Sequence, residues 1–257
     1  MLIYNEECYV AFIDILGFKD YVKSTDPQQI LKMFQHLIKV ETQIEKDKIR
    51  FFYDPKKQEK YNNLSDATYT YIMSDSIIIA IPSKIEDSFK FISKWCKNIQ
   101  VALLNRFGLL SRGGISKGLY YGDGIVNFGK GMVSAVELEG EAVNPRIIID
   151  PKLIELAKEL ENFLAYKFDV LVACDEKDGQ YYIDYLDDFN WDAQTRDTLL
   201  TLIERGKNTG YDGVKSKYEW LETHIRLKID EYEEMIYQDR CAQEYFESEE
   251  YQTEDLT

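Results

Sequence analysis

Two aspartates that follow apolar segments have the residue types and the spacing to do chemistry. Asp14 lies within residues 12–18 (FIDILGF), and Asp75 lies within residues 72–77 (IMSDSI). A carboxylate set in apolar sequence is costly unless hydrogen bonds or a cation compensate for its charge. Two carboxylates brought together repel each other, and a divalent metal ion removes that repulsion. The pair therefore predicts a site that binds a metal ion and phosphate.

The strands that must position these aspartates are indicated by apolar runs and turn residues. Four strands are expected in the first half of the chain, at residues 8–15, 69–73, 77–81 and 111–121. The second and third form a hairpin with Ser74 and Asp75 at its turn.

Two helices are expected between these strands. Asp26 and Pro27 indicate the start of the first, because aspartate is a favoured N-cap and proline fits the first helical position. Residues 83–86 (SKIE) have the pattern of a capping box and indicate the start of the second. The polar residues 54–66 are expected to form a loop.

The order strand, helix, strand, strand, helix, strand predicts an α+β fold of the ferredoxin-like type, βαββαβ. In this fold an antiparallel sheet carries helices on one face. The first strand lies beside the central hairpin, so Asp14 is expected close to Asp75.

The rest of the chain is expected to extend this core. Residues 170–174 and 181–185 are predicted to form a second hairpin. From about residue 190 the chain is predicted to be helical, and an apolar stripe over residues 214–236 either packs on the main domain or forms a dimer contact. The predicted domains are residues 1–175, the core domain, and residues 176–257, a hairpin and helical extension with an acidic tail.

Composition limits the classes of function. The 257 residues carry a formal net charge of −15, which repels nucleic-acid backbones and argues against DNA or RNA binding. We expect no signal peptide and no membrane segment, because there is no basic N-terminal region and no apolar run of roughly 20 residues. The four cysteines are far apart, which argues against a zinc site. A cytoplasmic protein is predicted.

Four segments in order resemble the catalytic domain of class III nucleotide cyclases, over roughly residues 8–175. Residues 12–18 are similar to the first metal motif of that family, and residues 74–76 occupy the place of its second metal aspartate. Residues 112–118 (RGGISKG) match its arginine-x-glycine-isoleucine-x-x-glycine strand. Residues 129–139 follow the spacing of the helix that ends the catalytic core.

The resemblance implies an enzyme, a nucleotidyl cyclase (a phosphorus–oxygen lyase). In this family a nucleoside triphosphate binds with two divalent ions, Mn²⁺ or Mg²⁺, held by two aspartates and a backbone carbonyl. These ligands would be Asp14, Asp75 and the carbonyl of Ile15. The ribose 3′-oxygen attacks the α-phosphorus, and pyrophosphate leaves. Family sites lie between two cyclase domains, so the resemblance also implies a homodimer with active sites at the interface.

The resemblance also suggests which residues contact the substrate. Arg112 is expected to act on a phosphate or on the transition state, and Phe18 and Lys117 are expected to contact substrate. In cyclases that use ATP, a lysine and commonly an aspartate read the base, and those positions here are Tyr71 and Val126. A tyrosine fills more of the pocket and offers one hydroxyl and a stacking face.

A smaller base fits these two changes better than adenine does. The pattern resembles the bacterial pyrimidine cyclases of Pycsar anti-phage defence, which make cyclic UMP or cyclic CMP for a separate effector. The predicted substrate is therefore UTP, or else CTP.

One departure from the family leaves the activity open. The asparagine and arginine that the family places on its core-ending helix correspond to Val133 and Glu137. Arg112, Lys117 or Lys130 would have to supply the transition-state cation. The alternative is a non-catalytic, cyclase-like module that binds nucleotide and signals by conformation. A polymerase or cyclic-dinucleotide synthase of related topology is disfavoured, because the Gly-Gly-Asp/Glu-Glu-Phe signature is missing.

Several of these residues also have a purely structural interpretation. Asp75 could be an ordinary turn aspartate, and Arg112 could pair with a surface carboxylate. Tyr71 could belong to the core. The glycines of residues 112–118 could mark close packing of a helix on the strand.

Overall fold

The computed structural model describes residues 3–51, 55–163, 171–189 and 191–254. Contacts divide the chain into two compact units, Met1–Asp188 and Phe189–Thr257, which are described separately. The boundary predicted at residue 175 falls between two paired strands of the first unit. The contacts place the division thirteen residues later, at Asp188.

The strands of the first unit form one mixed sheet. Its order is β2-β3-β1-β4-β6-β8-β7, and β5 pairs with β4. The strands are β1 Ile3–Leu16, β2 Tyr69–Met73, β3 Ser76–Pro82, β4 Leu110–Gly122, β5 Asn127–Phe128, β6 Ile147–Ile149, β7 Val172–Cys174 and β8 Tyr181–Ile183. β1 is antiparallel to both β3 and β4, whereas β6 is parallel to β4.

The helices of the first unit connect these strands. They are α1 Phe18–Ser24, α2 Pro27–Phe51, α3 Pro55–Ala67, α4 Ser88–Ala102, α5 Lys130–Glu141 and α6 Ile154–Phe163. Short helical turns cover Leu103–Phe107, Pro151–Leu153 and Leu186–Asp188. The strand order β2-β3-β1-β4, with helices between β1 and β2 and between β3 and β4, confirms the predicted ferredoxin-like α+β core.

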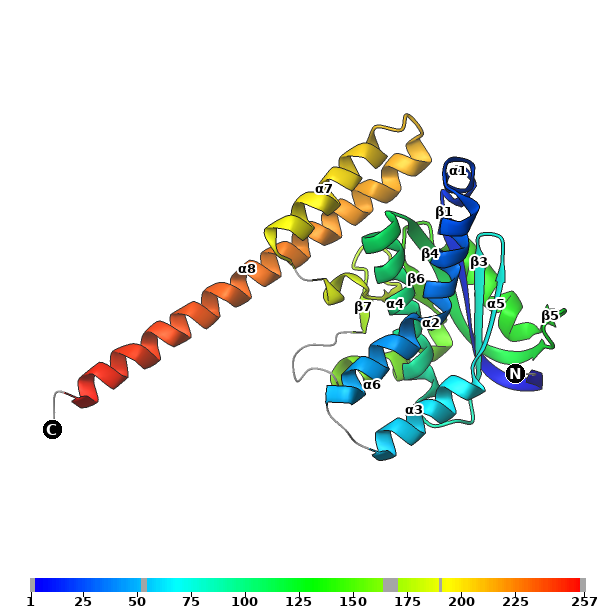
Figure 1. Ribbon diagram of the computed structural model, residues 1–257, viewed down its shortest axis with the longest axis horizontal. Coiled ribbons are helices and arrows are strands. Elements are labelled where there is room, and N and C mark those ends of the chain that lie inside the picture. The colour runs from blue at the N-terminus through cyan, green and yellow to red at the C-terminus, as the bar shows by residue number, and fades with distance from the viewer. Residues whose placement is uncertain (1–2, 52–54, 164–170, 190, 255–257) are drawn as a thin grey trace. The chain divides into compact units, whose positions relative to one another are not determined.

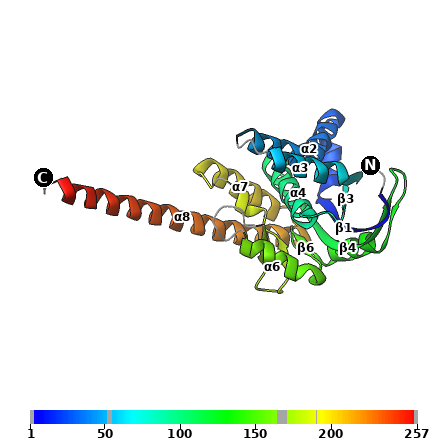
Figure 2. The same cartoon turned by 90° about the horizontal axis from the view of Figure 1, so that it is seen from below.

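Alternation along β1 separates the two faces of the sheet. Tyr9, Ala11, Ile13 and Ile15 enter the main core, which α2, α3 and α4 cover (Figures 1 and 2). The intervening residues, from Cys8 to Asp14, face the other side, where α5 packs on β1 and β4. One face therefore carries the bulk of the core, and the α5 face carries Asp14.

Close packing holds α5 against β4. A Cβ atom at Gly114 would lie 2.3 Å from Leu138 Cβ, and one at Gly118 would lie 2.7 Å from the backbone nitrogen of Gly131. Between these glycines, the Ser116 hydroxyl donates a hydrogen bond of 2.5 Å to the Gly131 carbonyl. The glycines of β4 thus leave room for α5 to pack closely on the strand, which is the structural role that the sequence suggested for them.

Two local predictions were wrong. The loop expected at residues 54–66 is instead helix α3, because its lysine, glutamine and glutamate residues are good helix formers although few of its residues are apolar. The helix expected to begin within residues 83–86 begins at Ser88. The Ser83 hydroxyl donates to the Glu7 carboxylate at 3.1 Å and does not cap a helix.

The second unit contains two packed helices, α7 Ala193–Lys207 and α8 Asp212–Glu254. α7 packs along the first part of α8 (Figure 1), where Leu221 and Ile225 of the predicted stripe are buried. Gly206 makes room for the ring of Tyr218. Within the described residues, no helix has both the length and the apolar composition needed to cross a lipid bilayer.

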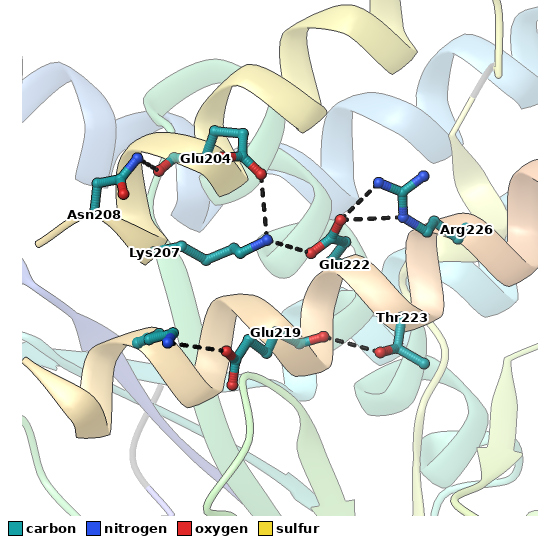
Figure 3. A network of polar contacts seen from close by, with 8 residues as sticks. Glu204, Lys207, Asn208, Glu219, Glu222, Thr223 and Arg226 are labelled. Atoms are coloured by element: carbon teal, nitrogen blue, oxygen red, sulfur yellow. Dashed lines mark hydrogen bonds and ion pairs between the residues drawn. The ribbon is translucent and has the colours of Figure 1, made fainter.

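Charged side chains link α7 to α8 beside this packing (Figure 3). Lys207 Nζ lies 3.2 Å from a Glu204 oxygen and 2.8 Å from a Glu222 oxygen, and Arg226 lies 2.7 Å from the other Glu222 oxygen. Arg226 is exposed, so its pair with Glu222 contributes at most about 1 kcal/mol, whereas Lys207 and Glu222 are partly buried. Apolar packing between the helices accompanies these pairs.

The packing of α5 on β4 makes a testable prediction about stability. Gly114→Ala should lower the free energy of unfolding by about 1–3 kcal/mol, because the new methyl group overlaps Leu138 and the Ala135 carbonyl. Gly140→Ala on α5 is the matched control, since its Cβ meets no atom within 4 Å. Urea titrations would measure both. Equal stability of Gly114→Ala and the unmodified protein would contradict the packing described.

Candidate functional site

The pairing of β1 with β3 brings the two predicted aspartates to one end of the sheet. Asp14 is in register with Ser76 on β3, immediately after Asp75. The turn between β2 and β3 is made by Ser74, with a left-handed φ of 59°, and Asp75. The Ile15 N–H donates a hydrogen bond of 2.9 Å to the Asp75 carbonyl, which ties the turn to β1.

A guanidinium lies on the other side of Asp14. Arg112 on β4 is in register with Asp14, and its Nε lies 3.8 Å from Asp14 Oδ2. The same Nε lies 2.5 Å from Glu139 Oε1 on α5. The Glu139 side chain is only 12% exposed. Arg112 therefore pairs mainly with a partly buried carboxylate that faces the site, and not with one on the open surface.

Glu139 is the residue of this site that sequence reasoning missed. It falls within the segment that resembles the core-ending helix, where the resemblance points only to Val133 and Glu137. The helical periodicity of α5 could have indicated it. Glu139 lies about one turn after Ala135 and next to Leu138, and both of these residues face the sheet.

The charges of the site act on one another. Burial raises the pKa of Glu139, the nearby Arg112 opposes that rise, and the negative charges of Asp14 and Asp75 add to it. Three carboxylates and one guanidinium leave an excess of negative charge at this end of the sheet. A bound cation would relieve that excess.

The donor atoms suit a hard divalent cation. Asp14 and Asp75 supply carboxylate oxygens. The Ile15 N–H points toward the β2–β3 turn. In a β-strand the N–H and C=O of one residue point toward the same neighbouring strand, so the Ile15 carbonyl oxygen also lies on the side of that turn. All-oxygen donors fit Mg²⁺ or Mn²⁺. In the described part of the chain no three His, Cys, Asp or Glu side chains are grouped to hold a metal ion, so backbone oxygen and water would complete the coordination.

The two residues predicted to shape the base pocket lie on different elements. Tyr71, on β2, is half-buried and packs against the apolar cluster on the α5 face of the sheet. Val126 is 47% exposed in the turn between β4 and β5. There the Asp123 carboxylate accepts hydrogen bonds from the backbone N–H groups of Ile125 and Val126, at 2.8 and 2.7 Å.

Two other predicted substrate contacts lie away from Asp14. Phe18 is buried in the main core, with its ring centroid 5.6 Å from that of Phe34. Lys117 is in register with Tyr9, whose side chain enters the main core, and its Nζ pairs with Glu7 at 3.0 Å. Both residues are therefore on the face of the sheet opposite Asp14.

The expected transition-state positions on α5 face solvent. Val133 is 56% exposed, and Glu137 is also exposed. Nearby Arg146 is 1% exposed and pairs with Asp175 at 2.6 Å and with Asp178. Arg146 is thus a structural cation that fixes the β7–β8 turn, whereas Arg112 lies beside Asp14.

No protein-family model matches the sequence, and no curated protein matches it significantly. Among solved structures, the adenylyl cyclase CyaB from P. aeruginosa is 12% identical, with 73% of this chain and 97% of that chain covered and a TM-score of 0.44. The structure is similar to catalytic domains of nucleotide cyclases.

Two further cyclases show the same likeness. The catalytic core of a rhodopsin-guanylyl cyclase with converted specificity, in complex with ATPαS, is 13% identical, with coverage of 71% and 97% and a TM-score of 0.41. A bacterial light-regulated adenylyl cyclase is 11% identical, with coverage of 79% and 99% and a TM-score of 0.40.

The assignment of Arg146 as structural makes a second prediction. Arg146→Ala should lower the free energy of unfolding by about 3–5 kcal/mol, because it leaves Asp175 buried without its main partner. Arg226→Ala, which removes an exposed ion pair, should cost less than about 1 kcal/mol. Thermal or urea denaturation would compare them. Similar effects for the two variants would show that Arg146 has no special structural role.

Proposed function

We propose that this chain is a metal-dependent nucleotidyl cyclase that converts a pyrimidine nucleoside triphosphate, UTP or else CTP, to the 3′,5′-cyclic monophosphate and pyrophosphate. One observation carries the proposal. The β1–β3 register places Asp14 and Asp75 at one end of the sheet, with Arg112 paired beside Asp14. Carboxylates and a guanidinium in this arrangement suit a metal–triphosphate complex.

Each residue has a defined role in the proposed reaction. Asp14, Asp75 and the Ile15 carbonyl hold two divalent ions, Mn²⁺ or Mg²⁺. When bound, the ions neutralise charge on the attacking and leaving oxygens and lower the pKa of the 3′-hydroxyl. Arg112 neutralises charge on the phosphates. The ribose 3′-oxygen bonds to the α-phosphorus, the bond to the bridging oxygen breaks, pyrophosphate leaves and the hydroxyl proton passes to water.

The choice of a pyrimidine rests on Tyr71 and Val126. Neither position offers the ammonium or the carboxylate that would read adenine. Tyr71 is half-buried on the α5 face, and its ring is larger and less polar than the end of a lysine side chain, which favours a smaller base in the proposed pocket. The cyclic product is proposed to act on a separate effector in bacterial anti-phage defence, a role that rests on the resemblance to pyrimidine cyclases alone.

A homodimer with shared active sites is part of the proposal. Large apolar side chains lie exposed on β2, in the β4–β5 turn, on β5 and on α5: Met73, Ile125, Phe128 and Val133. If a second copy brings such groups together in one contiguous patch, they suit an interaction surface. A second copy of the chain would cover them and supply the other half of the site.

A non-catalytic nucleotide-binding module is the second candidate. The solvent-facing Val133 and Glu137 favour it, because neither can stabilise a pentacoordinate phosphate as asparagine and arginine would. This candidate predicts nucleotide binding without release of pyrophosphate.

Incubation of the purified chain with Mn²⁺ and each of ATP, GTP, CTP and UTP would separate the two candidates. We expect cyclic UMP, or else cyclic CMP, with stoichiometric pyrophosphate, measured by mass spectrometry. Asp14→Asn and Asp75→Asn should each lower turnover at least about 100-fold, because loss of metal ions removes several kcal/mol of transition-state stabilisation.

Asp20→Asn, which changes an exposed carboxylate on α1, is the matched control and should be fully active. Nucleotide binding with no cyclic product from any of the four triphosphates would favour the non-catalytic module. Turnover that survives Asp14→Asn would contradict the proposed site.

A further inference from the structure

The Arg112 guanidinium lies beside two carboxylates and is closer to one of them. Arg112 Nε lies 2.5 Å from Glu139 Oε1 but 3.8 Å from Asp14 Oδ2. Arg112 Nε and Glu139 Oε1 are both shielded from water, and their contact is an ion pair without hydrogen-bond geometry. Charges interact more strongly in such surroundings than in bulk solvent. Arg112 is therefore held mainly by Glu139, with Asp14 as its more distant partner.

The position of Glu139 on α5 keeps it close to Arg112. Glu139 lies on α5, which is docked on β4 through Gly114, Ser116 and Gly118. The helix cannot move toward Asp14 without breaking that packing, so the backbone that carries Glu139 is held beside β4 and Arg112. The charges of Asp14 and Asp75 contribute to the raised pKa of Glu139, in keeping with the place of all three carboxylates at the same end of the sheet.

This arrangement affects how Asp14 binds a cation. A guanidinium paired fully with Asp14 would compete with a divalent ion for the same oxygens, and its positive charge would repel that ion. Glu139 draws Arg112 away from Asp14 and offsets its charge. Arg112 then remains near the site for phosphate, and its pull on the Asp14 carboxylate is weaker than in a close ion pair.

We propose that Glu139 is a positioning residue that sets the metal affinity of the Asp14–Asp75 site by holding Arg112. The inference rests on the proposed function, because it requires that these aspartates bind a divalent ion. A purely structural role for Glu139, as a tie between α5 and β4, would affect folding but not metal affinity through Arg112.

Mn²⁺ binding without nucleotide tests the inference directly. The full chain is titrated with Mn²⁺, and the free ion is measured by its electron paramagnetic resonance signal. Glu139→Gln keeps the size and polarity of the side chain but removes its charge. It should weaken Mn²⁺ binding about 10–100-fold, the usual effect of changing a residue that orients a metal ligand. Glu141→Gln on the same helix, which changes an exposed carboxylate, should bind Mn²⁺ as the unmodified chain does.

A double variant separates positioning from structure. In Arg112→Met with Glu139→Gln the competing cation is gone, so Mn²⁺ affinity should return to within about threefold of the unmodified chain. The two residues act through each other if the double variant binds Mn²⁺ as tightly as Arg112→Met alone does, because Glu139→Gln then has no effect once Arg112 is gone. Arg112→Met alone should bind Mn²⁺ at least as tightly as the unmodified chain, even if the tie to α5 is lost. Circular dichroism confirms that each variant is folded.

The outcomes are distinguishable. If the unmodified chain binds Mn²⁺, Asp14→Asn abolishes binding and Glu139→Gln leaves it unchanged, the inference is wrong and the proposed function stands. A loss in Glu139→Gln that the double variant does not restore also overturns the inference, because the effect is then structural. If no Mn²⁺ binding depends on Asp14, both the proposed function and the inference fail.

Discussion

The pairing of β1 between β3 and β4 is the constraint on which the rest of the site depends. Its register sets Asp14 next to Ser76 on one side and opposite Arg112 on the other. The hydrogen bond from Ile15 to the Asp75 carbonyl then fixes the turn that carries the second aspartate. A shift of one residue would turn Asp14 into the apolar core and would separate it from Arg112. The hydrophobic alternation of β1 prevents that shift.

The second support of the site is helix α5. Glycines on β4 let its backbone approach the sheet, and this brings Glu139 to Arg112. The excess of negative charge at this end of the sheet is destabilising in isolation, since like charges repel. Arg112 offsets part of it. A divalent ion would offset the remainder, so the site is better suited to binding metal than to stabilising the fold.

Much of the core was predictable from sequence because it rests on local patterns. Apolar runs marked β1 and the β2–β3 hairpin, and their order defined the topology that joins Asp14 to Asp75. The helix α3 was missed, because its helical preference is not accompanied by an apolar stripe. Lys117 was predicted to contact substrate, but the alternation of β4 places it on the other face. Glu139 was missed because a contact between a helix and a strand depends on how the two pack, which spacing in one segment does not reveal.

Anomalous diffraction from crystals of this chain grown with Mn²⁺ and a non-reactive pyrimidine triphosphate analogue tests the central claim most directly. We expect a manganese peak that is contacted by both aspartates, within about 2.0–2.6 Å of a carboxylate oxygen of Asp14 and of one of Asp75. Manganese bound elsewhere on the chain, with both carboxylates contacting only protein or water, would contradict it.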